Sequence, residues 1–300
     1  MKFNRRAFIK SSSLITAGLF LPANKLIAAL QEDLDNMKTL RNNVGIYTER
    51  GGTIGWYISD DAVVVIDSQF PDTANNFISL LMDMTHNKID VVINTHHHRD
   101  HTSGNVSFNK ICDTFVANEN TVTLQKKFYG GNESDDTQIY ASVTFKDKWS
   151  TKIGNENIIA EHLWAAHTGC DSFIHFENAN IVHLGDLIFN NVYPFIDRPG
   201  WANIQGWINY LEEISKRFDN DTIFIFGHGA SVYGGKNDLS KMKDYLSTLL
   251  DFINKNIKEG KSKEEIEGLN FLPGYEYLND SGTNRLKNNL SAAYEELISD

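Results

Sequence analysis

Four side chains that can bind a metal ion lie within six residues of one another: His96, His98, Asp100 and His101. Neutral imidazole and carboxylate groups are ligands for zinc and similar first-row metals. These residues follow 89–93, a β-branched run that predicts a buried strand. Alternate residues of an extended segment point to the same side, so His96 and His98 should converge on one point. Asp100 and His101 come after the chain turns and should reach a second point nearby. A polar loop that is merely rich in histidine is the alternative.

Side chains of the same kind recur where later predicted strands end. We expect strands near residues 44–47, 54–58, 62–68, 89–94, 111–117, 143–145, 158–163, 172–176, 180–184 and 221–226. The metal-capable residues that close such strands are Asp67, His96, His167, Asp186 and His228. Residues at the exit edge of strands share one rim of a sheet, so we expect these side chains to meet there.

The other predicted elements indicate a β-rich fold with helices. Short turns join the first strands, which favours antiparallel hairpins. No G-x-G-x-x-G follows these strands, which excludes a Rossmann-type opening. Amphipathic helices are predicted at residues 73–85, 119–128, 207–218, 239–258, 263–268 and 281–298. Because 41% of the 300 residues are hydrophobic, the chain can bury a sizeable core.

The charge balance is acidic. The chain has 28 Lys and Arg residues against 39 Asp and Glu, a net charge of −11. Residues 1–29 contain five of the basic residues and no acid, so the rest of the chain is more acidic still. Such a chain repels polyphosphates, which argues against a nuclease and against nucleic acid as a partner.

The N-terminal residues 1–29 have the order of a secretory signal: a basic region, an apolar region at 14–21, and the small pair Ala28-Ala29. Arg5-Arg6, followed by Phe8 and Lys10, resembles a twin-arginine signal, although Asn4 stands where serine or threonine is commoner. The apolar region is too short for a stable membrane span. We therefore expect export by the twin-arginine machinery, into the periplasm or otherwise out of the cytoplasm. An amphipathic N-terminal helix is the alternative.

The chain contains two cysteines, Cys112 and Cys170. A disulfide between them is the alternative in an exported protein. Cys170 lies three residues after His167, inside a second group of candidate ligands, and we favour free thiols.

The motifs occur in an order that resembles the metallo-β-lactamase superfamily. The resemblance rests on His96-His97-His98-Arg99-Asp100-His101, on His167 in His-Thr-Gly-Cys-Asp, on Asp186 in Gly-Asp-Leu-Ile-Phe and on His228 in Gly-His-Gly. It covers about residues 44–230. It implies an α/β fold, an αββα sandwich in which two mixed sheets pack face to face, helices lie outside, and the metals lie at one sheet edge. We accordingly divide the chain into a signal at 1–29, a metallo-β-lactamase-like domain at 30–235, and a helical extension at 236–300 packed on that domain.

The resemblance also implies two metal sites, with zinc favoured and iron or manganese possible. The residues that match the first site are His96, His98 and His167. Those that match the second are Asp100, His101 and His228. Asp186 matches a carboxylate that bridges both metals, and Asp67 matches one that supports the ligand loop. Asp100, besides being a ligand, is the side chain that we expect to act in catalysis.

Five more residues need an interpretation. His97 should point away from its neighbours and not bind metal, with a ligand role as the alternative. His183 is either packed in the core or hydrogen-bonded to a ligand. Arg198 and Lys236 either hold a substrate carboxylate or are solvated surface charges. Trp201 is either a wall of the substrate pocket or part of the core.

The implied reaction is hydrolysis of a carbonyl substrate, an ester, thioester or lactam, by a hydroxide that bridges two metals. The best-known zinc β-lactamases have cysteine, lysine and arginine where this chain has Asp186, Phe189 and His101. These departures look more like glyoxalase II, but the C-terminal helices show no basic site for a thiol conjugate.

Another β-lactamase subclass keeps histidine at position 101, so a true class B β-lactamase is the alternative. A non-catalytic metal-binding protein is the alternative of another class. Oligomeric state is open.

Overall fold

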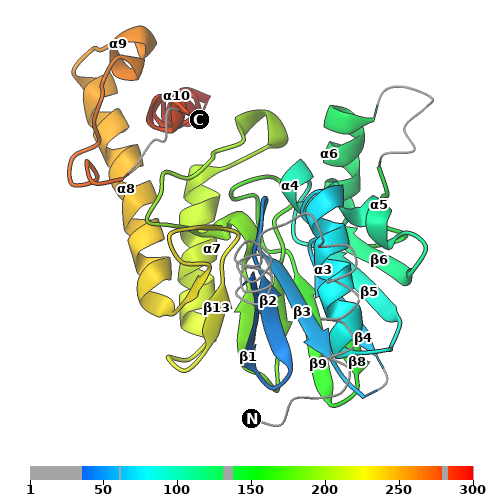
Figure 1. Ribbon diagram of the computed structural model, residues 1–300. Helices are drawn as coiled ribbons and strands as arrows, with labels where there is room; N and C mark the ends of the chain where they lie inside the picture. Colours follow the sequence, from blue (N-terminus) through cyan, green and yellow to red (C-terminus); the bar gives the residue numbers. More distant parts are fainter. Residues whose placement is uncertain (1–35, 61, 131–137, 279–282, 300) are drawn as a thin grey trace, which may run out of the picture.

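Two mixed β-sheets packed face to face form the centre of the molecule. The computed structural model describes residues 36–60, 62–130, 138–278 and 283–299. The predicted signal at 1–29 lies outside these residues. Figure 1 shows the sheets side by side, with helices on both outer sides.

The N-terminal sheet has seven strands in the order β1-β2-β3-β4-β5-β6-β7. Their bounds are β1 Met37–Arg41, β2 Val44–Tyr47, β3 Ile54–Ile58, β4 Val63–Ile66, β5 Ile89–Asn94, β6 Cys112–Asn118 and β7 Val143–Phe145. Strands β1 to β4 pair antiparallel, as the short turns predict, and β4 to β7 pair parallel. The carboxyl ends of β4 and β5 therefore lie at one edge of the sheet.

The C-terminal sheet has six strands in the order β15-β13-β11-β10-β9-β8. Their bounds are β8 Lys148–Ile153, β9 Glu156–Glu161, β10 Phe173–Phe176, β11 Ile181–His183, β13 Ile223–Ile225 and β15 Tyr233–Gly234. All neighbours are antiparallel except β11 and β13, which are parallel. A separate parallel pair joins β12 Phe189–Asn190 to β14 His228–Gly229.

Strand β4 shows why the sandwich forms. All four of its residues are buried, and they alternate between two cores. Val64 and Ile66 face the second sheet, in a cluster that includes Ile174 of β10. Val63 and Val65 face the other way, toward α3 (Pro71–Met84), where they join a cluster with Phe77. A strand covered on both faces is apolar throughout, which explains the uninterrupted run of β-branched residues.

Helices cover the outer faces of both sheets. Helix α3, the short helices α4 (Arg99–Thr102) and α5 (Asn105–Phe108), and α6 (Glu119–Tyr129) lie on the side of the N-terminal sheet. Helices α7 (Ile204–Arg217) and α8 (Lys236–Lys258) lie on the other side. The fold is therefore the expected αββα sandwich.

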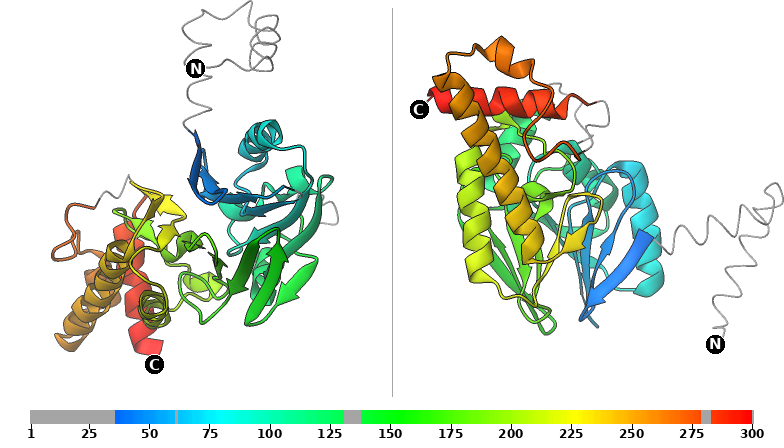
Figure 2. Two further views of the ribbon diagram at one scale, coloured as in Figure 1. Left: turned by 90° about the horizontal axis from the view of Figure 1, so that it is seen from below. Right: turned by 90° about the vertical axis from the view of Figure 1, so that its left-hand side faces the viewer.

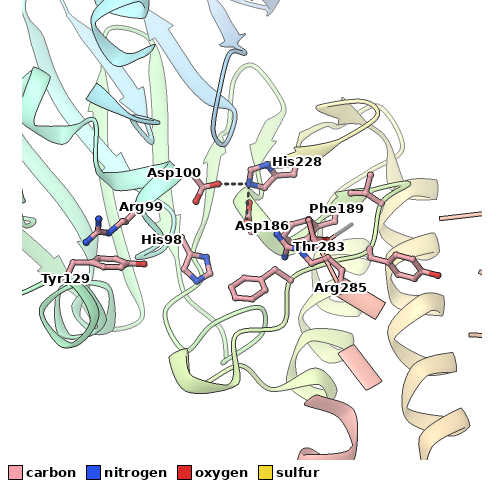
Figure 3. Close-up of a pocket in the computed structure, with 12 residues that line it drawn as sticks. His98, Arg99, Asp100, Tyr129, Asp186, Phe189, His228, Thr283 and Arg285 are labelled. Atoms are coloured by element: carbon pink, nitrogen blue, oxygen red, sulfur yellow. Dashed lines mark ion pairs between the residues drawn. The ribbon is translucent and has the colours of Figure 1, made fainter. Parts of the chain in front are cut away.

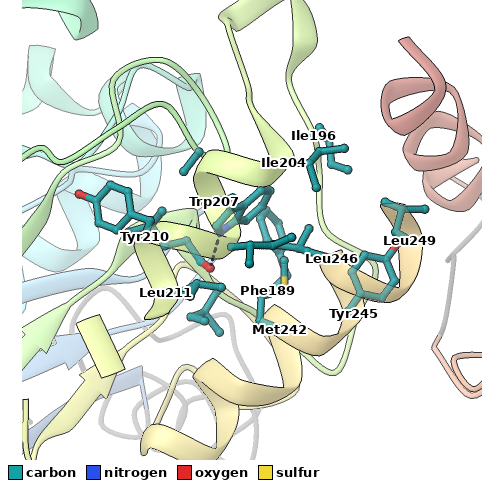
Figure 4. Close-up of a cluster of buried hydrophobic side chains, with 14 of the residues drawn as sticks. Phe189, Ile196, Ile204, Trp207, Tyr210, Leu211, Met242, Tyr245, Leu246 and Leu249 are labelled. Carbon is teal, nitrogen blue, oxygen red and sulfur yellow. Dashed lines mark hydrogen bonds between the residues drawn. The ribbon is translucent and has the colours of Figure 1, made fainter. Parts of the chain in front are cut away.

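The C-terminal helices share one core with α7 and the outer face of the second sheet. Besides α8 they are α9 (Lys263–Glu267) and α10 (Arg285–Ser299). Figure 4 shows Trp207 and Leu211 of α7 against Met242 and Leu246 of α8, and the same apolar cluster includes Leu290 of α10. Figure 2 shows α10 lying across the end of this helical layer.

The sequence patterns missed three edge strands. β1, β8 and β15 have no fully buried position, so their side chains carry little apolar periodicity. Helix α3 begins at Pro71, two residues before the predicted start at residue 73. Cys112 and Cys170 are free thiols, as expected. Among the described residues no helix is both long enough and apolar enough to cross a membrane.

Candidate metal centre

The candidate ligands, and Asp67 that supports them, lie where strands of both sheets end. Asp67 follows β4, and His96 lies two residues after the end of β5. Asp186 lies in a 3₁₀ turn, η1 (Gly185–Leu187), just after β11, and His228 begins β14 after β13. Because β4 with β5, and β11 with β13, are parallel neighbours, these four ends meet at one edge of the sandwich.

The first group is formed by three histidines and Asp186. Nδ1 of His98 lies 3.0 Å from Nε2 of His96 and 3.1 Å from Nε2 of His167. Oδ2 of Asp186 lies 3.8 Å from His96 Nε2 and 3.5 Å from His167 Nε2. One nitrogen from each ring and one carboxylate oxygen thus converge, within the spacing that a single metal ion would require.

The second group is formed by Asp100, His101 and His228. Nε2 of His228 lies 3.1 Å from Oδ2 of Asp100 and 3.3 Å from Nε2 of His101. Asp186 contacts this group as well: its Oδ1 lies 3.1 Å from His101 Nε2, and its Oδ2 lies 3.5 Å from His228 Nε2. Asp186 therefore stands between the two groups and touches both.

The far side of each ring explains why the ring nitrogens face one another. Nδ1–H of His101 donates to Asp67 Oδ2 at 2.7 Å, and Nδ1–H of His167 donates to the carbonyl of Phe195 at 2.6 Å. Nδ1 of His96 lies 3.0 Å from the Thr95 hydroxyl. A neutral ring with its proton on this outer nitrogen turns a lone pair inward. Lone pairs that face one another about 3 Å apart are stable only around a cation, so these residues fit metal ions.

The ionisation of the site fits the same conclusion. Burial lowers the pKa of His167 to about 3 and that of His96 well below its usual value, so both rings are neutral ligands. Burial alone would lower the pKa of His101, but Asp186, Asp67 and Asp100 raise it well above 6.5. The three carboxylates around the buried His101 ring create a negative potential there. A metal ion in the second group would be stabilised by that potential. Asp186 Oδ1 is buried and accepts no well-aligned hydrogen bond from the described residues.

Two glycines leave room for Asp186. Gly185 has φ +51°, a conformation that favours glycine, and turns the chain so that the next side chain points inward. A Cβ on Gly227 would lie 1.9 Å from Asp186 Oδ1. The Gly-Asp and Gly-His-Gly motifs thus combine a ligand with the space that its neighbour needs.

Asp67 and Thr95 brace the ligand loop. Asp67 accepts hydrogen bonds from the Thr95 amide at 2.8 Å and from the Thr95 hydroxyl at 2.7 Å, besides the one from His101. All three residues are buried. The carboxylate touches the loop from behind and does not face the centre of either ligand group.

Sequence reasoning missed Asp197. Its Oδ2 accepts a hydrogen bond of 2.9 Å from Nε2 of His98 and lies 3.4 Å from Nε2 of His97. His97 does point away from the first group, and it also lies 3.6 Å from the thiol of Cys170. Asp197 lies in the loop between β12 and α7, where no spacing relates it to the histidines, so only the fold reveals the pair.

Four other sequence candidates lie away from the ligand atoms. His183 bonds to the carbonyl of Thr53 and to the amide of Gly185, so it is packed in the core and does not hydrogen-bond a ligand. Arg198, one of the two cations with a possible role toward a substrate carboxylate, donates to Glu296 and to the carbonyl of Ala202. Trp201 is 42% exposed, and Lys236 begins α8. Neither residue lines the cavity at the metal groups, nor does Arg198.

A cavity of about 480 Å³ opens beside the two groups. Figure 3 shows its walls. The lining residues are His98, Arg99, Asp100, Tyr129, Asp186, Phe189, Val192, Tyr193, Phe195, His228, Thr283 and Arg285. Four of the candidate ligands thus face space that can hold a small molecule.

Comparison with known proteins agrees with this geometry. A family model described as the metallo-β-lactamase superfamily matches residues 47–228, more than half of the chain. The chain belongs to the metallo-β-lactamase superfamily. At the level of the superfamily it is a hydrolase with a candidate site of histidines and aspartates for metal ions.

Individual relatives of this superfamily member are distant. Metallo-β-lactamase IND-1 of Chryseobacterium indologenes is 21% identical over 206 residues, which cover 65% of this chain and 82% of that protein. The structure of a metallo-β-lactamase from Pontibacter korlensis has a TM-score of 0.61 and 16% identity, and it covers 70% of this chain and 98% of its own. Such low identities show the fold alone.

A third similar structure is the inverting sec-alkylsulfatase Pisa1 from Pseudomonas sp. Its TM-score is 0.68 at 14% identity, and the likeness covers 87% of this chain and 50% of that one. The chain therefore spans about half the length of the alkylsulfatase. A likeness of this extent must reach into residues 236–300, because residues 1–235 make up only about four-fifths of the chain.

Proposed function

We propose that the protein uses two metal ions to hydrolyse a carbonyl substrate, which is an ester, a thioester or a lactam. The observation that carries the proposal is the position of Asp186, which touches two separate groups of histidines. His96, His98 and His167 would hold one ion, Asp100, His101 and His228 the other, and Asp186 both. Zinc is the metal that best suits imidazole and carboxylate, with iron or manganese as alternatives. Metal ions bound in this way supply an acidified water and a positive charge for the developing oxyanion.

The chain's own residues orient the reaction. Burial would raise the pKa of Asp100, but His101 and His228 lower it overall, so the carboxylate stays ionised. Its side chain faces the cavity. We propose that it accepts a hydrogen bond from the attacking water and so fixes the direction of attack. Asp67 and Thr95 keep the ligand rings from turning.

Metal analysis and mutation together test the proposal. Purified protein should contain about two metal ions per chain by elemental analysis, and a value clearly below one would contradict the assignment. His96→Ala and Asp186→Ala should each abolish hydrolysis with near-native circular dichroism. His86→Ala, at an exposed histidine remote from the site, is the matched control. Activity that persisted in both ligand variants would place the chemistry elsewhere.

The substrate class is decided by a screen of the zinc-loaded protein. Nitrocefin should be set beside thioesters, lactones, and aryl phosphate and aryl sulfate esters. The similarity to metallo-β-lactamase IND-1 supports lactam hydrolysis as the second candidate. Efficient cleavage of nitrocefin with inert thioesters would establish that alternative. Two bound metals with no turnover of any substrate would favour a non-catalytic metal-binding protein.

We also propose that residues 1–29 direct export by the twin-arginine machinery to the periplasm. The pair Arg5-Arg6 and the short apolar region support this proposal. This route carries proteins that are already folded. That suits a site whose residues, from Asp67 to His228, are far apart in the sequence and come together only when the chain has folded. Replacing both arginines by lysine should leave the protein in the cytoplasmic fraction, whereas export of that variant would contradict the proposal.

A further inference from the structure

The turn between β2 and β3 lies against the second group of candidate ligands. Residues 51–53, here called the Gly-Gly-Thr turn, come directly before β3. They contact Asp100, the ring of His101 and the residue before His228. We propose that this turn is a positioning element for the second metal ion, and that the fit depends on Gly52. The inference rests on the proposed function, because it takes the two groups to hold two ions.

Gly52 lies directly against the ring of His101. A Cβ at Gly52 would lie 2.1 Å from Cε1 of His101 and 2.3 Å from Nε2, the nitrogen that faces His228. The φ angle of Gly52 lies outside the left-handed region, so the ring, and not the direction of the chain, excludes a side chain here. Asp67 accepts the hydrogen bond from Nδ1 of the same ring, so the ring cannot move aside without losing that bond. His101 is therefore enclosed between a carboxylate and the turn.

The Gly-Gly-Thr turn also joins the two sheets beside the second group. The amide of Gly52 donates to the carbonyl of Asp100 at 3.0 Å. The amide and the hydroxyl of Thr53 both donate to the carbonyl of Gly227, at 3.0 and 3.1 Å. Asp100 follows β5 of the N-terminal sheet, and Gly227 follows β13 of the C-terminal sheet. One short turn therefore sets the distance between ligands that come from different sheets.

The side chain of Gln69 fixes the position of Gly52. Its Nε2 donates to the carbonyl of Gly52 at 2.7 Å, and the residue is fully buried. Gln69 has φ +55°, a conformation that a residue other than glycine keeps only where its surroundings hold it. Its own carbonyl accepts a hydrogen bond of 2.8 Å from the amide of Gly104, which follows α4. Gln69 thus connects the turn to the segment that contains Asp100 and His101.

The contacts of the turn are confined to the second group. Among the described residues, no hydrogen bond joins residues 51–53 to a histidine of the first group. The rings of the first group have other partners, such as Asp197 behind His98. A change in the turn should therefore act on the second ion and leave the first in place.

The metal content of glycine variants tests the inference. Zinc-loaded wild type should contain about two ions per chain by elemental analysis. Gly52→Ala should contain about one, because the new methyl group displaces the ring of His101. Gly235→Ala adds the same methyl group where nothing lies within 4 Å, and its metal content should be that of the wild type. Two ions in Gly52→Ala, or none, would overturn the inference.

Two double variants identify the ion that is lost. His228→Ala removes a ligand of the second group, and adding Gly52→Ala to it should cause no further loss, because both changes act on the same ion. His96→Ala removes a ligand of the first group, and adding Gly52→Ala to it should leave almost no metal. The opposite pattern would show that the turn does not act on the second ion.

A milder variant tests the same role in case Gly52→Ala folds poorly. Gln69→Met keeps the length of the side chain but cannot donate to the carbonyl of Gly52. It should weaken binding of the second ion roughly tenfold and leave the first unchanged, as measured by competition with a chromophoric chelator. Gln205→Met, which removes only an exposed bond to Asn209, is the matched control. Equal weakening of both ions would indicate a general loss of structure and overturn the positioning role.

The outcomes separate this inference from the proposed function. A protein that loses one of two ions in Gly52→Ala, but hydrolyses none of the screened substrates, would overturn the hydrolase proposal alone. Hydrolysis by the wild type, with both ions retained in Gly52→Ala, would overturn the role of the turn alone. Circular dichroism of each variant establishes that the compared proteins are folded.

Discussion

Oδ2 of Asp197 accepts a hydrogen bond of 2.9 Å from Nε2 of His98, whose other ring nitrogen faces His96 and His167. The carboxylate therefore fixes both the orientation and the tautomer of His98. A carboxylate behind a histidine ligand also increases the basicity of the ring.

Asp197→Ala should weaken metal binding at the first group by roughly 10- to 100-fold, because His98 loses its orienting partner. Competition with a chromophoric chelator measures the affinity. Asp221→Asn, which removes an exposed acid that pairs with Arg41, is the control and should have no effect. An unchanged affinity in Asp197→Ala would show that His98 is positioned by other contacts.

Gly227→Ala should displace the carboxylate of Asp186, because the new methyl group would lie 1.9 Å from Oδ1. Since Asp186 touches both ligand groups, the variant should contain clearly less metal than the wild type by elemental analysis. Gly235→Ala adds the same methyl group where nothing lies within 4 Å, and its metal content should be normal. A full metal complement in Gly227→Ala would mean that Asp186 is not shared.

Glu296→Ala should destabilise the protein by about 3 kcal/mol, because the loss of a buried carboxylate leaves Arg198 and two backbone amides without their partner. Urea denaturation measures the free energy of unfolding. The neighbouring Glu295→Ala breaks only a surface pair with Lys263 and should cost less than about 1 kcal/mol. Similar losses in the two variants would argue against the anchoring role of Glu296.

Asp171 should make stability depend on pH. Burial raises the pKa of its carboxyl to about 8, against hydrogen bonds from Thr168 that lower it. In the unfolded chain an aspartate ionises near pH ~4. Between these values the folded protein holds a proton that the unfolded chain has lost, so this group's contribution to stability is complete below about pH 4 and declines toward pH 8.

Asp171→Asn removes this titration, so the variant should gain stability relative to the wild type as the pH rises from 5 to 8. Urea denaturation of both metal-free proteins at the two pH values measures the change. If the difference between the two proteins were the same at both pH values, Asp171 would not titrate between them.

The contacts of the adjacent residues Asp197 and Arg198 could not be predicted from the sequence. Of these adjacent charges in one loop, the sequence marked Arg198 as either a substrate-binding cation or a solvated surface charge, and it gave no signal for Asp197. In the structure Asp197 is the residue that contacts a candidate ligand: it bonds to His98, 99 positions away in the sequence. Arg198 bonds to Glu296, 98 positions away. No local pattern relates partners at such separations.

The ligand groups, by contrast, could be located because strand ends leave a local signal. His96 and Asp186 each follow a short β-branched or apolar run, and the order of the motifs resembles that of the superfamily. Arg285 has no such signal, since the first residue of a distant amphipathic helix resembles any solvated charge. The αββα layers were implied by the resemblance to the superfamily, whereas the cavity wall contributed by α10 was not.

The place of α10 in the chain also sets an order of assembly during synthesis. Arg285 leaves the ribosome more than fifty residues after His228, the final candidate ligand. The part of the cavity wall that Thr283 and Arg285 contribute is therefore synthesised after every candidate ligand. A nascent chain that has just exposed His228 thus carries all the candidate ligands but lacks one wall of the cavity beside them.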